Sequence, residues 1–187
     1  MPDPGWWEAL WPDPAGVLAK LGITSGMTVI DLCSGDGWFT LQIARIAHTV
    51  YAIDIDRKLL TMARIRLNEA NLGNCQFIEG DAFDIAQLAP ERADYVFLAN
   101  AFHGVPDPPR LTRAVHDSLK AYGLFVVVNW HARRREETTV LGEPRGPATD
   151  LRMTPEATFA AIEPSGFKTM ELVDVSPYHY GTVFQRL

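Results

Sequence analysis

The stretch VIDLCSGDGWFTLQIA, residues 29–44, sets two glycines and two acids between an apolar run and a segment of helical character. Gly35 and Gly37 let the backbone approach a ligand closely, and a helix that starts after them offers unpaired N–H groups. Asp31 and Asp36 flank the glycines, and carboxylates suit a ligand with positive charge better than a pyrophosphate. The turn therefore predicts a binding site for a cationic ligand.

Two common phosphate-binding turns do not fit this stretch. A dinucleotide-binding turn reads GxGxxG, and its third glycine permits close packing of helix on strand. Here Gly37 is followed by Trp-Phe-Thr, so that third glycine is missing. A P-loop is excluded as well, because no Gly-Lys followed by Ser or Thr comes after the turn.

The elements that position this turn follow from the periodicity of apolar residues. Short apolar runs alternate with amphipathic segments, which is typical of a parallel sheet covered by helices on both faces. One crossover helix is expected from a cap at Asp56 to Gly73, and another from Pro109 to just before Gly123. The five strands expected here, all buried on both faces, are Thr28–Leu32, Thr49–Ile53, Cys75–Ile78, Tyr95–Asn100 and Leu124–Trp130.

The remaining part of the chain starts with a long irregular segment. Residues 131–153 show no steady period, and a loop of this length in a compact domain is usually functional or disordered. A helix from Thr154 to Gly166 follows, and then strands at Lys168–Val175 and Tyr180–Leu187. Only SPYHY joins these two strands, which is too short for a crossover helix. The expected fold is α/β, with a seven-stranded, mostly parallel sheet and one antiparallel strand near the C-terminal end.

Composition narrows the class of partner. The chain has 187 residues, 47% of them hydrophobic, which suits one domain, and its net charge of −6 argues against a nucleic-acid partner. Neither a signal-like start nor a run of about 20 apolar residues is present, so a soluble, cytoplasmic protein without membrane contact is expected. Cys33 and Cys75 form no CxxC pair or Cys/His cluster, so no metal site is predicted.

The residues Asp31-Leu-Cys33-Ser-Gly35-Asp36-Gly37 resemble the first motif of the class I S-adenosylmethionine-dependent methyltransferases, acid-x-Gly-x-Gly-x-Gly. Cys33 replaces the first glycine, and a small residue serves there if the backbone is not left-handed. The resemblance covers residues 27–130 by motif and the remainder by topology. It implies a Rossmann-like three-layer sandwich, with S-adenosyl-L-methionine as cofactor and S-adenosyl-L-homocysteine as product.

Three further segments match the family in order. Asp54, followed by Ile55, lies where the strand-two carboxylate of the family accepts hydrogen bonds from the ribose hydroxyls. Asp81 in FIEGDAFD matches the acid at the adenine amino group, with the Ala82 backbone beside it, and Asn100 falls where strand four passes the methionine half of the cofactor. The cofactor-binding residues implied by the resemblance are Asp31, Cys33, Gly35, Asp36, Gly37, Asp54, Ile55, Asp81, Ala82 and Asn100.

The resemblance divides residues 1–187, a single domain, into four segments. These are an N-terminal lid or helix (1–26), a cofactor-binding core (27–130), an active-site loop (131–153), and a C-terminal helix and strand pair (154–187). Trp6, Trp7 and Trp11 in the first segment either fold over the cofactor as a lid or form a packing staple on the outside of the sheet.

Residues for the methyl acceptor are expected in the loops beyond the carboxyl ends of the parallel strands, where ligands bind in such sheets. His103 is the first candidate for a general base, and His179, next to Tyr180, is the second. A base is needed only for a hydroxyl or a similar weak acid; with an amine or thiol, aromatic faces would stabilise positive charge instead. The candidate acceptor-binding residues are Trp7, Phe102, Trp130, His131, Arg145 and Tyr178.

Several acceptor classes do not fit. Strand four ends in Asn-Ala-Phe-His and lacks the paired prolines of the DNA amino methylases, and neither cysteine follows a proline as cytosine C5 methylation requires. The arginine run 133–135 is either a solvated face or, beside Arg145, holds a carboxylate or phosphate of the acceptor. A small-molecule acceptor is favoured, while a cofactor-binding protein without turnover and a nicotinamide-binding domain stay open. The sequence leaves the reacting atom and the oligomeric state open, a homodimer included.

Overall fold

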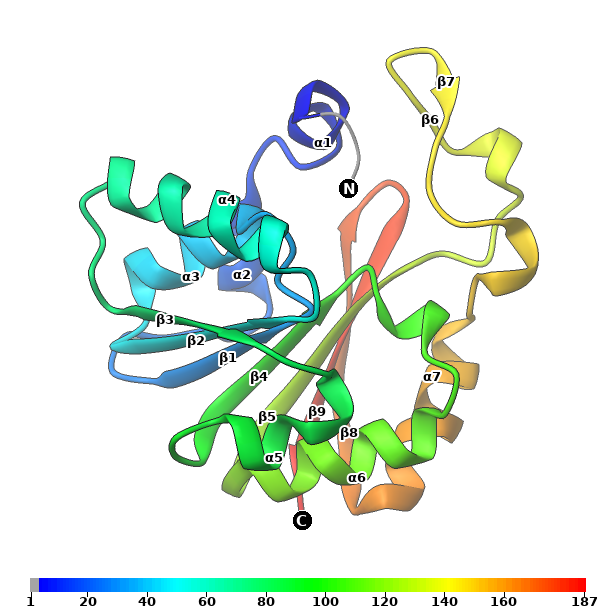
Figure 1. Cartoon of the computed structure of the whole chain (residues 1–187). Helices are drawn as coiled ribbons and strands as arrows, with labels where there is room; N and C mark the ends of the chain where they lie inside the picture. The colour runs from blue at the N-terminus through cyan, green and yellow to red at the C-terminus, as the bar shows by residue number, and fades with distance from the viewer. Residues whose placement is uncertain (1–3) are drawn as a thin grey trace.

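A seven-stranded sheet forms the centre of the protein, as the sequence predicts. In the computed structural model, which describes residues 4–187, the strands follow the order β3-β2-β1-β4-β5-β9-β8 (Figure 1). β9 pairs antiparallel with β5 and β8, and the other neighbours in the sheet pair parallel. The prediction of one reversed strand near the C-terminus is confirmed. The strand bounds are β1 Thr28–Leu32, β2 Thr49–Asp54, β3 Cys75–Glu79, β4 Ala93–Ala99, β5 Leu119–Trp130, β8 Phe167–Ser176 and β9 His179–Arg186.

Helices cover both faces of the sheet and complete three layers (Figure 1). Successive strand residues point to opposite faces, so each face buries its own apolar set. Val29 and Val50 belong to the cluster beneath α2 (Pro14–Lys20), α3 (Trp38–Ile46) and α4 (Arg57–Glu69). Ile30 and Ile53 belong to the cluster beneath α5 (Ile85–Leu88), α6 (Pro108–Ser118) and α7 (Pro155–Ile162).

Helix α4 begins at the predicted cap. Asp56 Oδ1 accepts hydrogen bonds from the backbone N–H groups of Lys58 at 2.8 Å and Leu59 at 3.4 Å, which satisfies two donors of the first turn. The helix ends at Glu69, before the predicted Gly73. No helix within residues 4–187 combines the length and the apolar character needed to cross a membrane.

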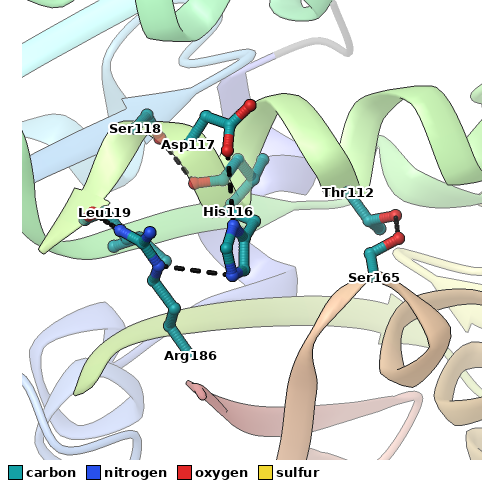
Figure 2. A network of polar contacts seen from close by, with 8 residues as sticks. Thr112, His116, Asp117, Ser118, Leu119, Ser165 and Arg186 are labelled. Atoms are coloured by element: carbon teal, nitrogen blue, oxygen red, sulfur yellow. Dashed lines mark hydrogen bonds and ion pairs between the residues drawn. The ribbon is translucent and has the colours of Figure 1, made fainter. Parts of the chain in front are cut away.

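Helix α6 ends earlier than predicted. The amphipathic pattern suggested a helix closing before Gly123, but α6 stops at Ser118 and Leu119 already pairs with β4. Figure 2 shows the contacts at this end: the Arg186 guanidinium, on β9, donates to the Leu119 carbonyl oxygen, and its Nε donates to His116 Nε2 at 3.3 Å. A strand from the far end of the chain thus helps to fix the end of this helix.

The segment 131–153 was expected to lack regular structure. It contains short elements that pack against the indole ring of Trp130. It forms the two-stranded ladder of β6 (Thr139–Val140) and β7 (Glu143–Pro144), with single 3-10 turns at Arg135–Glu137 and Thr149–Leu151. A Cβ added at Gly146 would lie 2.8 Å from the Trp130 ring, so only glycine permits this approach. The Arg152 guanidinium lies 5.0 Å from the centroid of the same ring. The segment is therefore packed onto the end of β5.

The N-terminal tryptophans divide between the two roles considered from the sequence. Trp11 is 1% exposed, with its ring centroid 5.2 Å from Phe39 and 4.4 Å from His179, so it is part of the core. Trp6 and Trp7 lie on α1 (Pro4–Leu10), which is placed near β6 above the end of the sheet (Figure 1). These two indoles line a cavity described below, and their role as a lid stays a prediction.

Gly37 offers a test of the helix packing that shapes the turn after β1. Its φ is +82°, and an added Cβ would lie 2.7 Å from Ala63 Cβ on α4. Gly37→Ala is therefore expected to lower the free energy of unfolding by about 2–4 kcal/mol, from left-handed strain together with overpacking. Urea unfolding measures the change. Gly73→Ala is the matched control because its Cβ would meet open space; equal effects at the two positions would contradict the argument.

Candidate active site

The turn after β1 has left-handed backbone at three positions. Cys33 and Gly35 both have φ +58°, and Gly37 has φ +82°. The expectation that Cys33 replaces glycine without a left-handed backbone is wrong. For a non-glycine residue this conformation costs about 1–2 kcal/mol, and the surrounding turn holds it in place.

Asp54 ties this turn to the end of β2. Its Oδ2 accepts a hydrogen bond from the Gly35 N–H at 2.8 Å, and its Oδ1 accepts one from the Asp56 N–H at 2.9 Å. The carboxylate is half-buried and lines both cavities of the site. Each oxygen has a second lone pair, so the carboxylate can accept further hydrogen bonds from a ligand.

Asp31 is a buried acid beneath the turn. It is 3% exposed, and its Oδ2 accepts a hydrogen bond from Thr40 Oγ1 at 2.5 Å. Burial raises the pKa of Asp31 to about 7, against the lowering effect of the Thr40 hydrogen bond, and the charge of Asp54 raises it further. A bound cation would favour the ionised form of Asp31 and so lower this pKa.

Asp36 is also buried, but it already has a cationic partner. Its Oδ2 lies 3.0 Å from Arg66 Nη2 of α4, and its backbone carbonyl oxygen accepts from Arg66 Nε at 3.2 Å. The same guanidinium lies 5.3 Å from the centroid of the Trp38 ring. Asp36 lines the cavity with its charge balanced by Arg66, while its Oδ1 is buried and accepts no hydrogen bond within residues 4–187.

A cavity of about 650 Å³ opens at the carboxyl ends of the central parallel strands, within the range usual for small-molecule sites. Among the predicted cofactor residues, its wall contains Asp31, Cys33, Gly35, Asp36, Asp54 and Asn100. Among the residues predicted for the acceptor or for catalysis, it contains Trp7, His103, Trp130 and Arg145. The two predicted groups therefore meet in one space.

A smaller cavity of about 300 Å³ adjoins the first and shares Cys33, Asp54 and Ala101 with it. Its other wall residues include the predicted Ile55, Asp81 and Ala82. Asp81 Oδ1 accepts from the Phe83 N–H at 2.9 Å and caps the 3-10 turn Ala82–Asp84. This apolar slot with an acid at its edge has the character of a site for a flat heterocycle. Gly37 lines neither cavity and serves the packing of α3 against α4.

Asn100, at the end of β4, presents an amide without a protein partner. Its φ is +59°, and its N–H donates to the Val128 carbonyl oxygen at 2.8 Å. Neither Asn100 Nδ2 nor Oδ1 forms a hydrogen bond within residues 4–187, although both atoms are buried in the wall of the larger cavity. A buried polar group without a partner is costly, so this amide is suited to bind a ligand.

His103 lies in a short 3-10 turn after β4 and contacts the larger cavity. Burial lowers the pKa of His103, the neighbouring Asn129 side chain raises it, and the positive charge of Arg152 lowers it again. The net shift is downward, so the imidazole is neutral at pH 7 and able to accept a proton.

Besides Gly37, five predicted site residues lie outside both cavity walls. His179 is fully buried between the rings of Trp11 and Trp130, with its Nδ1 2.8 Å from Ser176 Oγ. Tyr180 is fully buried as well, and its hydroxyl lies 2.7 Å from Thr158 Oγ1. Neither side chain reaches the cavity, so neither is carried into the functional proposal.

The other three of these residues are also occupied elsewhere. Phe102 is 1% exposed in the core beneath α6. His131 Nε2 lies 3.1 Å from Asp174 on a separate surface hollow, and the Tyr178 hydroxyl donates to the Thr139 carbonyl oxygen at 3.0 Å. Within residues 4–187, no three His, Cys, Asp or Glu side chains gather as a metal site would require.

Sequence reasoning did not single out several residues of the larger cavity wall. Trp38 and Phe39 follow the glycines directly, so their place in the wall was readable from the motif. Gly146 and Pro147 come from the segment packed on Trp130, as does Arg135 of the arginine run already considered from the sequence. Only the indole contact shows which side of that segment faces the site.

The fold, with acids at the tips of adjacent parallel strands, has the layout of the class I methyltransferases. The comparison with known families agrees with this class: residues 23–158 match the family described as "Methyltransferase domain". The chain belongs to this family.

The names of its relatives refer to different methyl acceptors. It is 29% identical over 113 residues to the putative ribosomal RNA large subunit methyltransferase MJ1649 of Methanocaldococcus jannaschii, covering 58% of this chain and 27% of that protein. It is 30% identical over 99 residues to the ubiquinone biosynthesis O-methyltransferase of Albidiferax ferrireducens, covering 53% and 39%. The chain spans about a quarter to a half of the length of the curated relatives it matches first.

The fold has a close match among solved structures. A crystal structure of a SAM dependent methyltransferase from Aquifex aeolicus superimposes with a TM-score of 0.82, covering 99% of this chain and 94% of that one, at 22% identity. At this identity the likeness establishes the shared fold.

Asp31 gives a testable pH dependence. Its native pKa of about 7 lies above the ordinary aspartate value, so at intermediate pH the folded protein holds a proton that the unfolded chain has lost. As pH rises from about 4 to 7, this group lowers the free energy of unfolding by about 1.4 kcal/mol per pH unit, and the slope vanishes above that window. Urea unfolding of the wild type and of Asp31→Asn across the window measures it. The variant should lack this slope, and parallel profiles would refute the shift.

Proposed function

We propose that this chain binds S-adenosyl-L-methionine across the two adjoining cavities and transfers its methyl group to a small-molecule acceptor by in-line displacement. One observation carries the proposal. Asp31, Asp54 and Asp81, from the ends of three adjacent parallel strands, line two cavities that share Asp54 and Cys33. Acids placed in this way match a ligand with a cationic amino acid at one end and a nucleoside at the other.

The residues present fit each part of that cofactor. The Asp54 carboxylate, held by two backbone N–H groups, keeps lone pairs for two ribose hydroxyls. The slot of Ile55, Ala82 and Asp81 would hold the adenine ring and its amino group. The buried carboxylate of Asp31 and the unpartnered amide of Asn100 would bind the amino-acid end in the larger cavity.

The bound sulfonium supplies an activated methyl group, and the protein's task is to align the acceptor with it and to exclude water. Trp6 and Trp7, each 9% exposed, and the indole of Trp130 supply an apolar wall for this purpose. His103, neutral at pH 7, would take the proton of a hydroxyl acceptor as the bond to carbon forms. An amine or thiol that reacts in its deprotonated form would not need this base.

Cavity size and charge support a small acceptor. The larger cavity would be shared by the amino-acid end of the cofactor and the acceptor, which leaves space for a compact molecule. The net charge of −6 disfavours a polyphosphate backbone. The matches to the ribosomal RNA and ubiquinone relatives cover 58% and 53% of this chain and only 27% and 39% of those proteins, so they do not transfer either acceptor.

Calorimetry with S-adenosylhomocysteine tests the cofactor site. We expect binding, and we expect Asp54→Ala to reduce the affinity about tenfold to a hundredfold, as for the loss of a charged hydrogen-bond partner of about 1.5–3 kcal/mol. Asp84→Ala is the control, because Asp84 is an exposed acid outside both cavity walls. Since Asp54 also holds the Gly35 turn, thermal melts must show that each variant is folded. Unchanged affinity would remove Asp54 from the site, and binding of NADH alone would overturn the cofactor assignment.

Turnover with methyl-labelled cofactor and a metabolite extract tests catalysis. For a hydroxyl acceptor, His103→Gln is expected to lower kcat by about a hundredfold or more while the affinity for S-adenosylhomocysteine stays unchanged. The activity of the wild type should decline only at pH values below the ordinary histidine range, because the pKa of His103 is lowered. Full activity of the variant on a hydroxyl acceptor would exclude this base. Cofactor binding without any labelled product would favour the alternative, a binding protein without turnover.

A further inference from the structure

The larger cavity has opposite charges on its two sides. Acids from the ends of β1 and β2 line one side, whereas Arg135 and Arg145, from the segment that contains β6 and β7, line the other. Figure 1 places that segment beyond β5 and β9, away from the turns that follow β1 and β2. The acids account for the cofactor in the proposed function, and the arginines are left without a role.

Arg145 is held in place by its backbone and by an aromatic face. Its N–H donates to the Thr138 carbonyl oxygen at 2.9 Å, and its own carbonyl oxygen accepts from Arg152 Nη2 at 3.0 Å. The guanidinium lies 5.4 Å from the centroid of the Trp6 ring. Its Nε is buried, yet it donates to no acceptor within residues 4–187. A fixed guanidinium with a buried, unused donor is suited to bind an anion.

Arg135 comes from the turn that faces Arg145. Its N–H donates to Thr149 Oγ1 at 3.0 Å and its Nε donates to the Gly146 carbonyl oxygen at 3.1 Å, which fixes the stem of the side chain at the cavity. The ion pairs among residues 4–187 include neither Arg135 nor Arg145. Among the described residues, both positive charges are therefore left without a carboxylate partner.

A third cation lies directly behind this wall. Arg152 is 7% exposed, stacks over Trp130, and donates from Nη2 to Thr138 Oγ1 at 2.8 Å. Burial lowers the pKa of Arg152, the nearby charge of Arg135 lowers it further, and the charge of Glu136 raises it in part. A buried cation of this kind costs free energy unless negative charge lies near it. An anion bound between the cavity-facing arginines would offset part of that cost.

We infer that the methyl acceptor carries a carboxylate or a phosphate group on a flat apolar body, with the anion on Arg145 and Arg135 and the body against Trp6 and Trp130. This inference rests on the proposed function. A guanidinium binds either anion through paired N–H donors, and Trp6, Trp7 and Trp130 supply an apolar wall for a ring. The acceptor is then oriented at both ends, with its reacting atom in the space between His103 and the acids.

The test measures anion preference in protein saturated with S-adenosylhomocysteine. Calorimetry compares naphthalene-2-carboxylate, naphthyl-2-phosphate, the neutral 2-naphthamide and the cationic 2-naphthylmethylamine. We expect at least one anionic probe to bind about tenfold more tightly than the neutral one, and the cation to bind least. The preference should shrink as salt is raised, because exposed charges are screened.

Variants assign the preference to individual arginines. Arg145→Gln should remove most of the anion preference, and Arg145→Lys should keep part of it, because the charge remains while the paired donors are lost. Arg133→Gln is the matched control. Arg133 belongs to the same arginine run as Arg135 but lines a separate hollow with His131 and Asp174. Equal binding of anionic, neutral and cationic probes, or equal losses in Arg145→Gln and Arg133→Gln, would overturn the inference. Melting temperatures confirm that the variants are folded.

S-adenosylhomocysteine has a carboxylate of its own, which is a second candidate partner for Arg145. A further comparison distinguishes this carboxylate from an anionic group on the acceptor. The affinities of Arg145→Gln for S-adenosylhomocysteine and for methylthioadenosine, which lacks the amino-acid end, are compared with those of the wild type. If Arg145 binds the acceptor, both affinities stay unchanged. A tenfold loss for S-adenosylhomocysteine alone would assign Arg145 to the cofactor and overturn the inference. Failure of the wild type to bind S-adenosylhomocysteine would refute the proposed function itself.

Discussion

The site depends on the hydrogen bond between the Gly35 N–H and the Asp54 carboxylate, which joins the turn after β1 to the end of β2 at 2.8 Å. The two strands are in parallel register, with Leu32 opposite Ile53, so the turn and the acid leave the sheet at the same level. The backbone of Cys33, Gly35 and Gly37 then follows a left-handed path that no run of ordinary residues adopts easily. A carboxylate fixed in this way faces two cavities without needing a side-chain partner.

Around this contact, acidic and basic side chains lie on opposite sides of the cavity, and aromatic rings pack against them. Asp31 is buried with Thr40, Asp36 is balanced by Arg66, and the arginines of the segment 131–153 lie across the cavity. The covering depends on aromatic rings: Gly146 and Arg152 pack on Trp130, and the Trp6 ring lies against Arg145. One indole at the end of β5 therefore holds the segment that supplies the positive wall.

Most of the sheet was predictable because its parallel strands contain short, mostly apolar runs that are separated by helices of clear period. The predicted bounds of β1 were matched residue for residue, and those of β2 and β3 to within one residue at one end. Helix α6 was predicted too long, since its amphipathic pattern continues past Ser118 while Arg186, on β9, contacts the Leu119 carbonyl oxygen. Such a contact between distant parts of the chain leaves no local signal in the sequence.

The sequence by itself determined the order of the elements, the glycine turn and the acids at the strand ends, because parallel strands bring their carboxyl ends to one edge of a sheet. It did not decide which aromatic and histidine side chains reach the cavity. His103 and Trp7 line the wall, while His179 and Tyr180, at equally suggestive positions, are enclosed in the core. Only the tertiary structure makes that choice, because the direction of a side chain after a strand end depends on what packs against it. The raised pKa of Asp31 has the same origin, since burial is a property of the packed fold and not of the residue.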